Sequence, residues 1–155
     1  MFWQGVKGTV IPNVLPVINR ERKETSNKVA GIIGSIDKNK NTHISIQRAL
    51  NDNCDKVLLF GLVTDNPYWE HAVKPLVDGD KVVFSGYIQN RDAIYSQLDV
   101  VYQSSDSECA SLVSHECKSL GLEFKGNENI EEVTTLVSNS EILEKWKKIL
   151  DYDNW

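Results

Sequence analysis

Two glutamates lie eight residues apart around a predicted helix start, and their chemistry suits the binding of sugar hydroxyls. Glu108 ends a polar stretch over residues 104–108, and Glu116 lies within a predicted helix over residues 111–120. Eight residues turn a helix to within about 80° of its starting direction, so both carboxylates can face one crevice. A carboxylate can accept hydrogen bonds from two vicinal hydroxyls, as in ribose recognition. The same spacing also fits two surface residues without a partner.

The elements that must position these groups are visible as short apolar runs, rich in β-branched residues, that alternate with longer amphipathic segments. The predicted strands cover residues 29–34, 56–61, 81–84, 99–102 and, as a short fifth strand, 122–124. This alternation is typical of a parallel sheet that helices cover on both faces. The sequence therefore predicts an α/β fold with a Rossmann-like parallel sheet of about five strands.

Helix signals occupy the segments between these runs. Asn41 or Thr42 can cap the first helix, in which Ile44, Ala49 and Leu50 are the expected buried residues. Further helices are predicted over residues 67–77, from residue 90, and over residues 111–120, 130–137 and 141–150.

The last predicted helix, residues 141–150, carries an apolar stripe. Leu143, Trp146 and Leu150 recur at helical spacing on one side of it. Because a large aromatic side chain in a helix usually belongs to a core, we expect this stripe to pack against other helices.

The first residues differ from the alternating middle of the chain. Residues 1–28 contain Pro12 and Pro16, which discourage regular structure, and the charged stretch over residues 20–24 is typical of a solvated linker. We therefore expect a lead-in segment over residues 1–28 and one Rossmann-like domain over residues 29–155.

Composition limits the classes of partner. The 155 residues carry a formal net charge of −5, so nothing supplies the basic field that attracts nucleic acid. The three cysteines form no Cys-x-x-Cys pair and the three histidines are far apart, which gives no metal site to predict. No apolar run approaches the ~20 residues of a transmembrane helix, and no secretory signal opens the chain. We expect a cytoplasmic protein.

The fold class predicts where a ligand would bind. In an open parallel sheet, ligands lie outside the carboxyl ends of the strands, which here places residues 34–41, 61–66, 85–90 and 103–110 around a candidate site. The last of these loops leads into a helix, whose first N–H groups and dipole favour a phosphate. The sequence has neither a Walker loop nor a Gly-x-Gly-x-x-Gly run, so an anionic ligand is expected without being identified.

Five stretches, in order and spacing, resemble a known family. They cover residues 10–13, 34–40, 82–87, 93–101 and 104–121, the last of them around the paired glutamates. Together they are similar to the C-terminal, donor-binding half of retaining GT-B glycosyltransferases of the glycogen-synthase-like and mannosyltransferase-like group. The resemblance implies one half of a GT-B fold and transfer of a sugar, with retention, from a nucleotide-sugar donor. It implies neither a metal nor a further cofactor.

The resemblance also implies roles for individual residues. Lys40 would lie on the diphosphate and neutralise charge on the leaving group, and Glu108 would face the sugar hydroxyls, which makes these two the predicted catalytic residues. Glu116 would bind the ribose hydroxyls. The remaining implied donor-binding residues are Gly34, Ser35, Gly86, Tyr87, Ile88, Ser111 and Leu112. Of these, the backbone at residues 87–88 would lie against the base, and the N–H groups of residues 111–112 would point at phosphate.

The sequence departs from the family pattern at several places. Ser35 stands where the family usually has an arginine, and residues 109–111 replace a Gly-Phe-Gly run. The acceptor half has no counterpart within the 155 residues, so the resemblance implies an N-terminal acceptor domain in a longer enzyme or on a partner chain. The alternative is a degenerate, non-catalytic GT-B-like module that acts as a binding or assembly partner.

Overall fold

The computed structural model describes residues 11–21, 26–108, 111–130, 133 and 135–150. The strands are β1 (Val29–Ile33), β2 (Lys56–Phe60), β3 (Val82–Gly86), β4 (Val100–Tyr102) and β5 (Glu123–Lys125). They form one sheet in the order β3-β2-β1-β4-β5, and each neighbouring pair is parallel. This confirms the predicted Rossmann-like α/β fold with a five-stranded parallel sheet.

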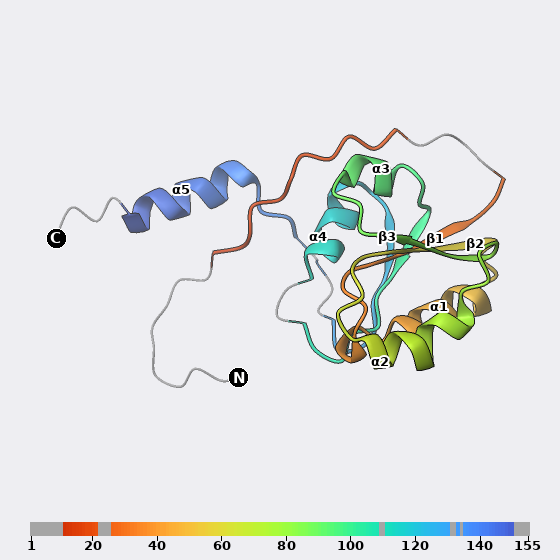
Figure 1. Cartoon of the computed structure of the whole chain (residues 1–155). Helices are drawn as coiled ribbons and strands as arrows, with labels where there is room; N and C mark the ends of the chain where they lie inside the picture. Colours follow the sequence, from red (N-terminus) through yellow and green to blue (C-terminus); the bar gives the residue numbers. More distant parts are fainter. Residues whose placement is uncertain (1–10, 22–25, 109–110, 131–132, 134, 151–155) are drawn as a thin grey trace.

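Helices cover both faces of the sheet (Figure 1). In β2, Val57 and Leu59 pack into one core cluster, whereas Leu58 and Phe60 pack into the other. Because successive side chains of a strand point to opposite faces, this alternation divides the core into two layers. The α1 (Thr42–Asn51) and α2 (Asn66–Tyr68) helices lie on one face, and α3 (Arg91–Tyr95) and α4 (Leu112–Ser119) lie on the other.

Helix α1 begins at Thr42, as predicted, but its buried side differs from the expected one. Thr42, Ser45, Ile46 and Ala49 are buried, whereas Ile44 is exposed. Residues three, four and seven positions apart share one helix face, and a residue two positions from Thr42 lies about 200° around the axis. The prediction that Ile44 is buried is therefore wrong.

The helical segment after β2 is not one regular helix. It consists of α2, a π-helical turn η2 (Trp69–Val73) and a 3₁₀ turn η3 (Lys74–Leu76). Asp65 caps its start by accepting a hydrogen bond from the N–H of Tyr68 at 3.0 Å, and Pro67 lies in the first turn, as predicted. Pro75 has no N–H to donate to the preceding turn, so a regular helix cannot continue through that position.

The region after β5 contains one of the two predicted helices. Helix α5 spans Asn139–Leu150. No helix is present at the described residues 133 and 135–137, so the helix predicted over residues 130–137 is wrong there. Its sequence is rich in β-branched residues, which lose side-chain freedom in a helix.

Helix α5 does not pack as predicted. The side chains of Leu143, Trp146 and Leu150 are 45–73% exposed, and Ile142 is the buried residue of this helix. Figure 1 shows α5 extending away from the layers around the sheet. The prediction that its apolar stripe packs against other described helices is wrong. Among the described residues, no helix is both long and apolar enough to span a membrane.

The described part of the lead-in, residues 11–21, has no helix or strand but is attached to the domain. The Arg20 guanidinium donates hydrogen bonds to the carbonyl oxygens of Tyr95 (3.1 Å) and Leu98 (2.8 Å). Arg20 is thus not part of a solvated linker, in contrast to the prediction, while residues 22–24 of that stretch lie outside the described residues. Leu15 exchanges two hydrogen bonds, of 2.9 and 2.8 Å, with the side-chain amide of Asn139.

Candidate functional site

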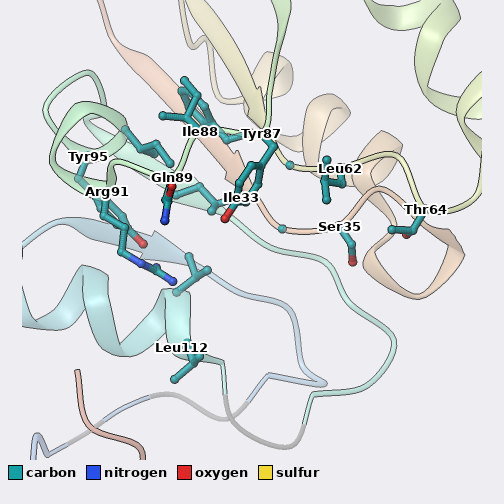
Figure 2. A pocket seen from close by; sticks show the side chains of 15 residues that line it. Ile33, Ser35, Leu62, Thr64, Tyr87, Ile88, Gln89, Arg91, Tyr95 and Leu112 are labelled. Carbon is teal, nitrogen blue, oxygen red and sulfur yellow. The ribbon is translucent and has the colours of Figure 1, made fainter. Parts of the chain in front are cut away.

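A cavity of about 560 Å³ opens at the carboxyl ends of the strands, on the side of α3 and α4 (Figure 2). Ile33 and Gly34 after β1, and Phe60 and Gly61 after β2, form part of its lining. The N–H of Gly34 donates to the carbonyl of Phe60 at 2.9 Å, so the two loops lie against each other. A Cβ atom at Gly61 would lie 1.7 Å from the carbonyl oxygen of Gly34, which only glycine avoids.

Five of the residues predicted to bind the donor line this cavity. They come from the loops after β1 and β3 and from the start of α4, and they are Gly34, Ser35, Tyr87, Ile88 and Leu112. Figure 2 shows Tyr87 and Ile88 beside Ile33, with Leu112 across the opening on α4. The loops were expected to converge because the carboxyl ends of parallel strands meet at one edge of a sheet.

Two other predicted residues, Gly86 and Ser111, lie next to the cavity and are not part of its lining. Gly86 ends β3 with a φ of 70°, and its carbonyl accepts a hydrogen bond from the N–H of Gly61 at 2.9 Å. Ser111 caps α4: its hydroxyl accepts from the N–H of Ser114 at 3.1 Å and donates to the Gln103 side chain at 2.6 Å. Both residues shape the ends of elements from which lining residues project.

Glu116 is buried behind the cavity wall and has two hydrogen-bond donors. Its side chain is 1% exposed. The Tyr95 hydroxyl donates to Glu116 Oε2 at 2.5 Å, and the Arg91 guanidinium forms an ion pair with Oε1. Tyr95 and Arg91 line the cavity, whereas Glu116 does not. Burial, followed by the hydrogen bond to Glu116, holds the pKa of the Tyr95 phenol well above its usual value, so this hydroxyl remains a donor.

Arg91 was not among the predicted site residues. A signal was present: Arg91 directly follows the cap Asn90, whose side chain accepts from the N–H of Ala93 at 3.2 Å. A positive charge in the first turn of a helix is disfavoured by the helix dipole, so an arginine there needs a reason outside the helix. The ion pair with Glu116 supplies one.

The two predicted catalytic residues lie together. Lys40 forms an ion pair with Glu108 Oε1, the same oxygen that accepts from Gln103 Nε2 at 2.6 Å and from Ser105 Oγ at 2.9 Å. Lys40 ends the 3₁₀ turn η1 (Lys38–Lys40), which Asp37 caps by accepting from the N–H of Lys40. Lys40 borders a recess of about 10 Å³ that the chain after β1 separates from the main cavity.

Ser35 lines both the cavity and the recess. Its hydroxyl donates to Asp37 Oδ2 at 2.6 Å. A neutral side chain bonded to a carboxylate therefore occupies the position at which the resemblance leads one to expect a cation. Among the described residues, no three His, Cys, Asp or Glu side chains are grouped to hold a metal ion.

Neither a family model nor a curated protein matches the sequence. Similar solved structures include TarM (TM-score 0.62, 19% identity, 92% of this chain and 31% of that chain). HepE of Anabaena, in complex with UDP and glucose, is similar with a TM-score of 0.57 at 18% identity. WaaG, a glycosyltransferase involved in lipopolysaccharide biosynthesis, is similar with a TM-score of 0.55 at 16% identity. The HepE and WaaG matches each cover 82% of this chain and 39% of the other.

The likeness establishes the fold. The five-stranded parallel α/β domain matches part of proteins that include glycosyltransferases, which confirms the expected GT-B-type half. The chain spans about a third of the length of these proteins.

Proposed function

We propose that this chain is the nucleotide-sugar-binding domain of a retaining glycosyltransferase, completed by an acceptor domain in a longer chain or on a partner chain. The observation that carries the proposal is the convergence of Gly34, Ser35, Tyr87, Ile88 and Leu112 on one cavity at the strand ends. Ligands of open α/β sheets bind at this edge, so the cavity has the expected place for a nucleotide.

The lining also supports this class of ligand. Apolar side chains, among them Ile33, Phe60 and Ile88, suit a nucleobase, and the neutral polar groups of Ser35 and Thr64 offer hydrogen bonds to hydroxyls. UDP is the first nucleotide to test, because HepE was solved with UDP and glucose and a variant of S. aureus TarM was solved with UDP.

Lys40 and Glu108 are the residues to which we assign the chemistry. In the transfer, the bond between the anomeric carbon and the terminal phosphate oxygen breaks, and that oxygen leaves with the diphosphate. The acceptor hydroxyl bonds to the anomeric carbon and passes its proton to the departing phosphate oxygen. The Lys40 ammonium, oriented by Glu108, would stabilise the charge that develops on the leaving oxygen, as positioned cations do in other transfer reactions.

Calorimetric titration of the whole chain with UDP, GDP, ADP and their glucose derivatives tests the proposal. We expect saturable binding of one nucleotide class, with a Kd in the micromolar to millimolar range typical of enzyme substrates. A Gly61→Ala variant that remains folded is the matched control, because its added methyl group would displace the loop after β1. Absence of binding to every nucleotide at millimolar concentration would remove the proposal.

A non-catalytic module is the second candidate, and Ser35 favours it. The hydroxyl that bonds to Asp37 cannot replace a cation at the leaving diphosphate. The loss of such a contact costs roughly a hundredfold to a thousandfold in rate. A coding sequence for a second Rossmann-like half, adjacent to that of this chain, would favour the enzyme. Nucleotide binding without sugar transfer, once the chain is joined to that half, would favour the module.

A further inference from the structure

The main cavity has a single charged side chain among the described residues that line it, and that residue is Arg91. The rest of the lining is apolar or neutral. Lys40, the cation of the neighbouring recess, is paired with Glu108. Because Lys40 does not line the main cavity, an anionic group that enters it meets Arg91 as the cation of the lining.

Arg91 is held in a way that presents it to the cavity. Its Nη1 bonds to the buried carboxylate of Glu116, and the Tyr95 hydroxyl bonds to the other oxygen of that carboxylate. The Glu116 side chain is 1% exposed, but that of Arg91 is 42% exposed, so the positive end of the pair faces the open space. In Figure 2 the Arg91 side chain extends from the α3 side toward α4 across the cavity.

A guanidinium has five N–H donors in a rigid fork, and the carboxylate of Glu116 occupies part of that fork through Nη1. Glu116 is the polar partner of the Arg91 side chain within the described part of the chain. The remaining donors match the oxygens of a phosphate, and a fixed guanidinium loses less freedom when it binds than a mobile one.

From this geometry we infer that Arg91 binds a phosphate of the ligand and that Glu116 and Tyr95 position it. The identity of the ligand as a nucleotide rests on the proposed function, whereas the anion site itself rests on Arg91 and its exposed face. Glu116 was expected to bind the ribose hydroxyls itself. In this inference its role is instead to position Arg91.

Three ligands separate the inference from the proposed function. Inorganic pyrophosphate tests the anion site, and UDP compared with uridine tests the nucleotide. We would titrate each into isotope-labelled whole chain and follow the Arg91 side chain and the cavity amides by NMR. The variants are Arg91→Gln and Arg91→Lys, with Lys81→Gln as the matched control that removes one exposed charge at the amino end of β3.

The inference predicts pyrophosphate-induced shifts of the Arg91 side chain and of the cavity amides, and it predicts that the amide shifts are abolished in Arg91→Gln and retained in Lys81→Gln. It also predicts that Arg91→Gln lowers the affinity for UDP on the order of 10- to 100-fold, since a charge-assisted hydrogen bond to a phosphate is lost. The affinity for uridine, which has no phosphate, should change by less than about twofold. Arg91→Lys should fall between wild type and Arg91→Gln, because it keeps the charge but lacks the fork.

Three results would overturn the inference. They are the absence of a pyrophosphate-induced shift at Arg91, an equal loss of affinity for UDP and uridine in Arg91→Gln, and tighter binding of uridine by Arg91→Gln. The last result would mean that Arg91 covers Glu116 and that Glu116 is the ligand contact. If pyrophosphate binds at Arg91 but no nucleotide does, the anion site stands and the proposed function falls.

Discussion

Glu108 and Glu116 flank the same helix start, yet they differ in surroundings and in what they can reach. Glu108 is 13% exposed, and its three described donors all converge on one oxygen. Glu116 is 1% exposed, and its two donors occupy different oxygens. The partners of Glu116 open on the 560 Å³ cavity, whereas Lys40 borders the 10 Å³ recess. Two glutamates near the same helix start can thus have different surroundings. Glu116 is buried beside the cavity, where it holds Arg91 and Tyr95, whereas Glu108 lies in a polar loop beside Lys40.

The largest loss of stability should follow the replacement of Glu116, the more deeply buried of the two glutamates. Replacing Glu116 with alanine leaves the buried Tyr95 hydroxyl without its acceptor and leaves a space where the Glu116 side chain stood, whereas Arg91, at 42% exposed, can regain water. We expect the free energy of unfolding to fall by about 3 kcal/mol, because an unsatisfied buried hydroxyl and a new buried space each destabilise the fold. Urea unfolding followed by circular dichroism measures it. A loss below about 1 kcal/mol would mean that Glu116 is solvated in solution.

Tyr95→Phe tests the surroundings of Glu116 with a smaller change. It removes one hydrogen-bond donor from Glu116 and keeps the aromatic ring. We expect a loss of about 1–3 kcal/mol, because one buried acceptor site becomes unsatisfied. The pKa of Tyr95 is raised, so the folded protein holds the phenol proton more tightly than the unfolded chain does. The wild type should therefore lose stability relative to the variant as the pH rises above about 10. A constant difference between pH 8 and 11 would contradict this.

Glu108→Ala should have a smaller effect than either change. Lys40 is 27% exposed and can regain water when its partner is removed, and the buried Gln103 and Ser105 side chains keep a hydrogen bond to each other at 3.3 Å. We expect a loss of about 1 kcal/mol or less, since partly exposed ion pairs contribute little. Urea unfolding run beside Glu116→Ala gives the comparison directly. Equal losses in the two variants would remove the distinction between the carboxylates.

The smallest signal is expected from thiol labelling of Cys117, which follows Glu116 in the sequence. Burial, with a further contribution from the charge of Glu116, raises the pKa of its thiol to about 12. We expect no labelling of Cys117 by a thiol reagent in the folded protein at pH 8, because the thiolate is the reactive form. Mass spectrometry of the Cys117 peptide, with labelling in urea as the control, checks this. Labelling of the folded protein at the unfolded rate would contradict the burial of this helix face.

Local signals were sufficient for most of the fold. The helix start at Asn90 and the helix predicted over residues 111–120, which ends before Gly121 with its φ of 61°, are present where the sequence predicts them. The strands were predicted because continuous β-branched runs suit a sheet that is buried on both faces. Burial of Ile44 was predicted incorrectly, because the buried face of a short helix depends on its docking against the sheet.

The site was predictable only in part. The loops that converge at the strand ends follow from parallel topology, but the individual residues Tyr87 and Leu112 were named from the family resemblance. The partnership of Arg91 with Glu116 joins residues 25 positions apart on two helices. No local pattern encodes that distance. The exposure of the apolar stripe of α5, which includes Trp146, could not be predicted either. Helical spacing shows which residues share a face, but it does not show whether another surface covers that face.

A crystal structure of the chain with UDP tests the central claim most directly, that the cavity at the strand ends takes a nucleotide. The account predicts the uracil ring beside Ile33 and Tyr87, and a phosphate oxygen within hydrogen-bond distance of the Arg91 guanidinium. An empty cavity in crystals soaked at saturating UDP would contradict it. So would a nucleotide bound at any other surface.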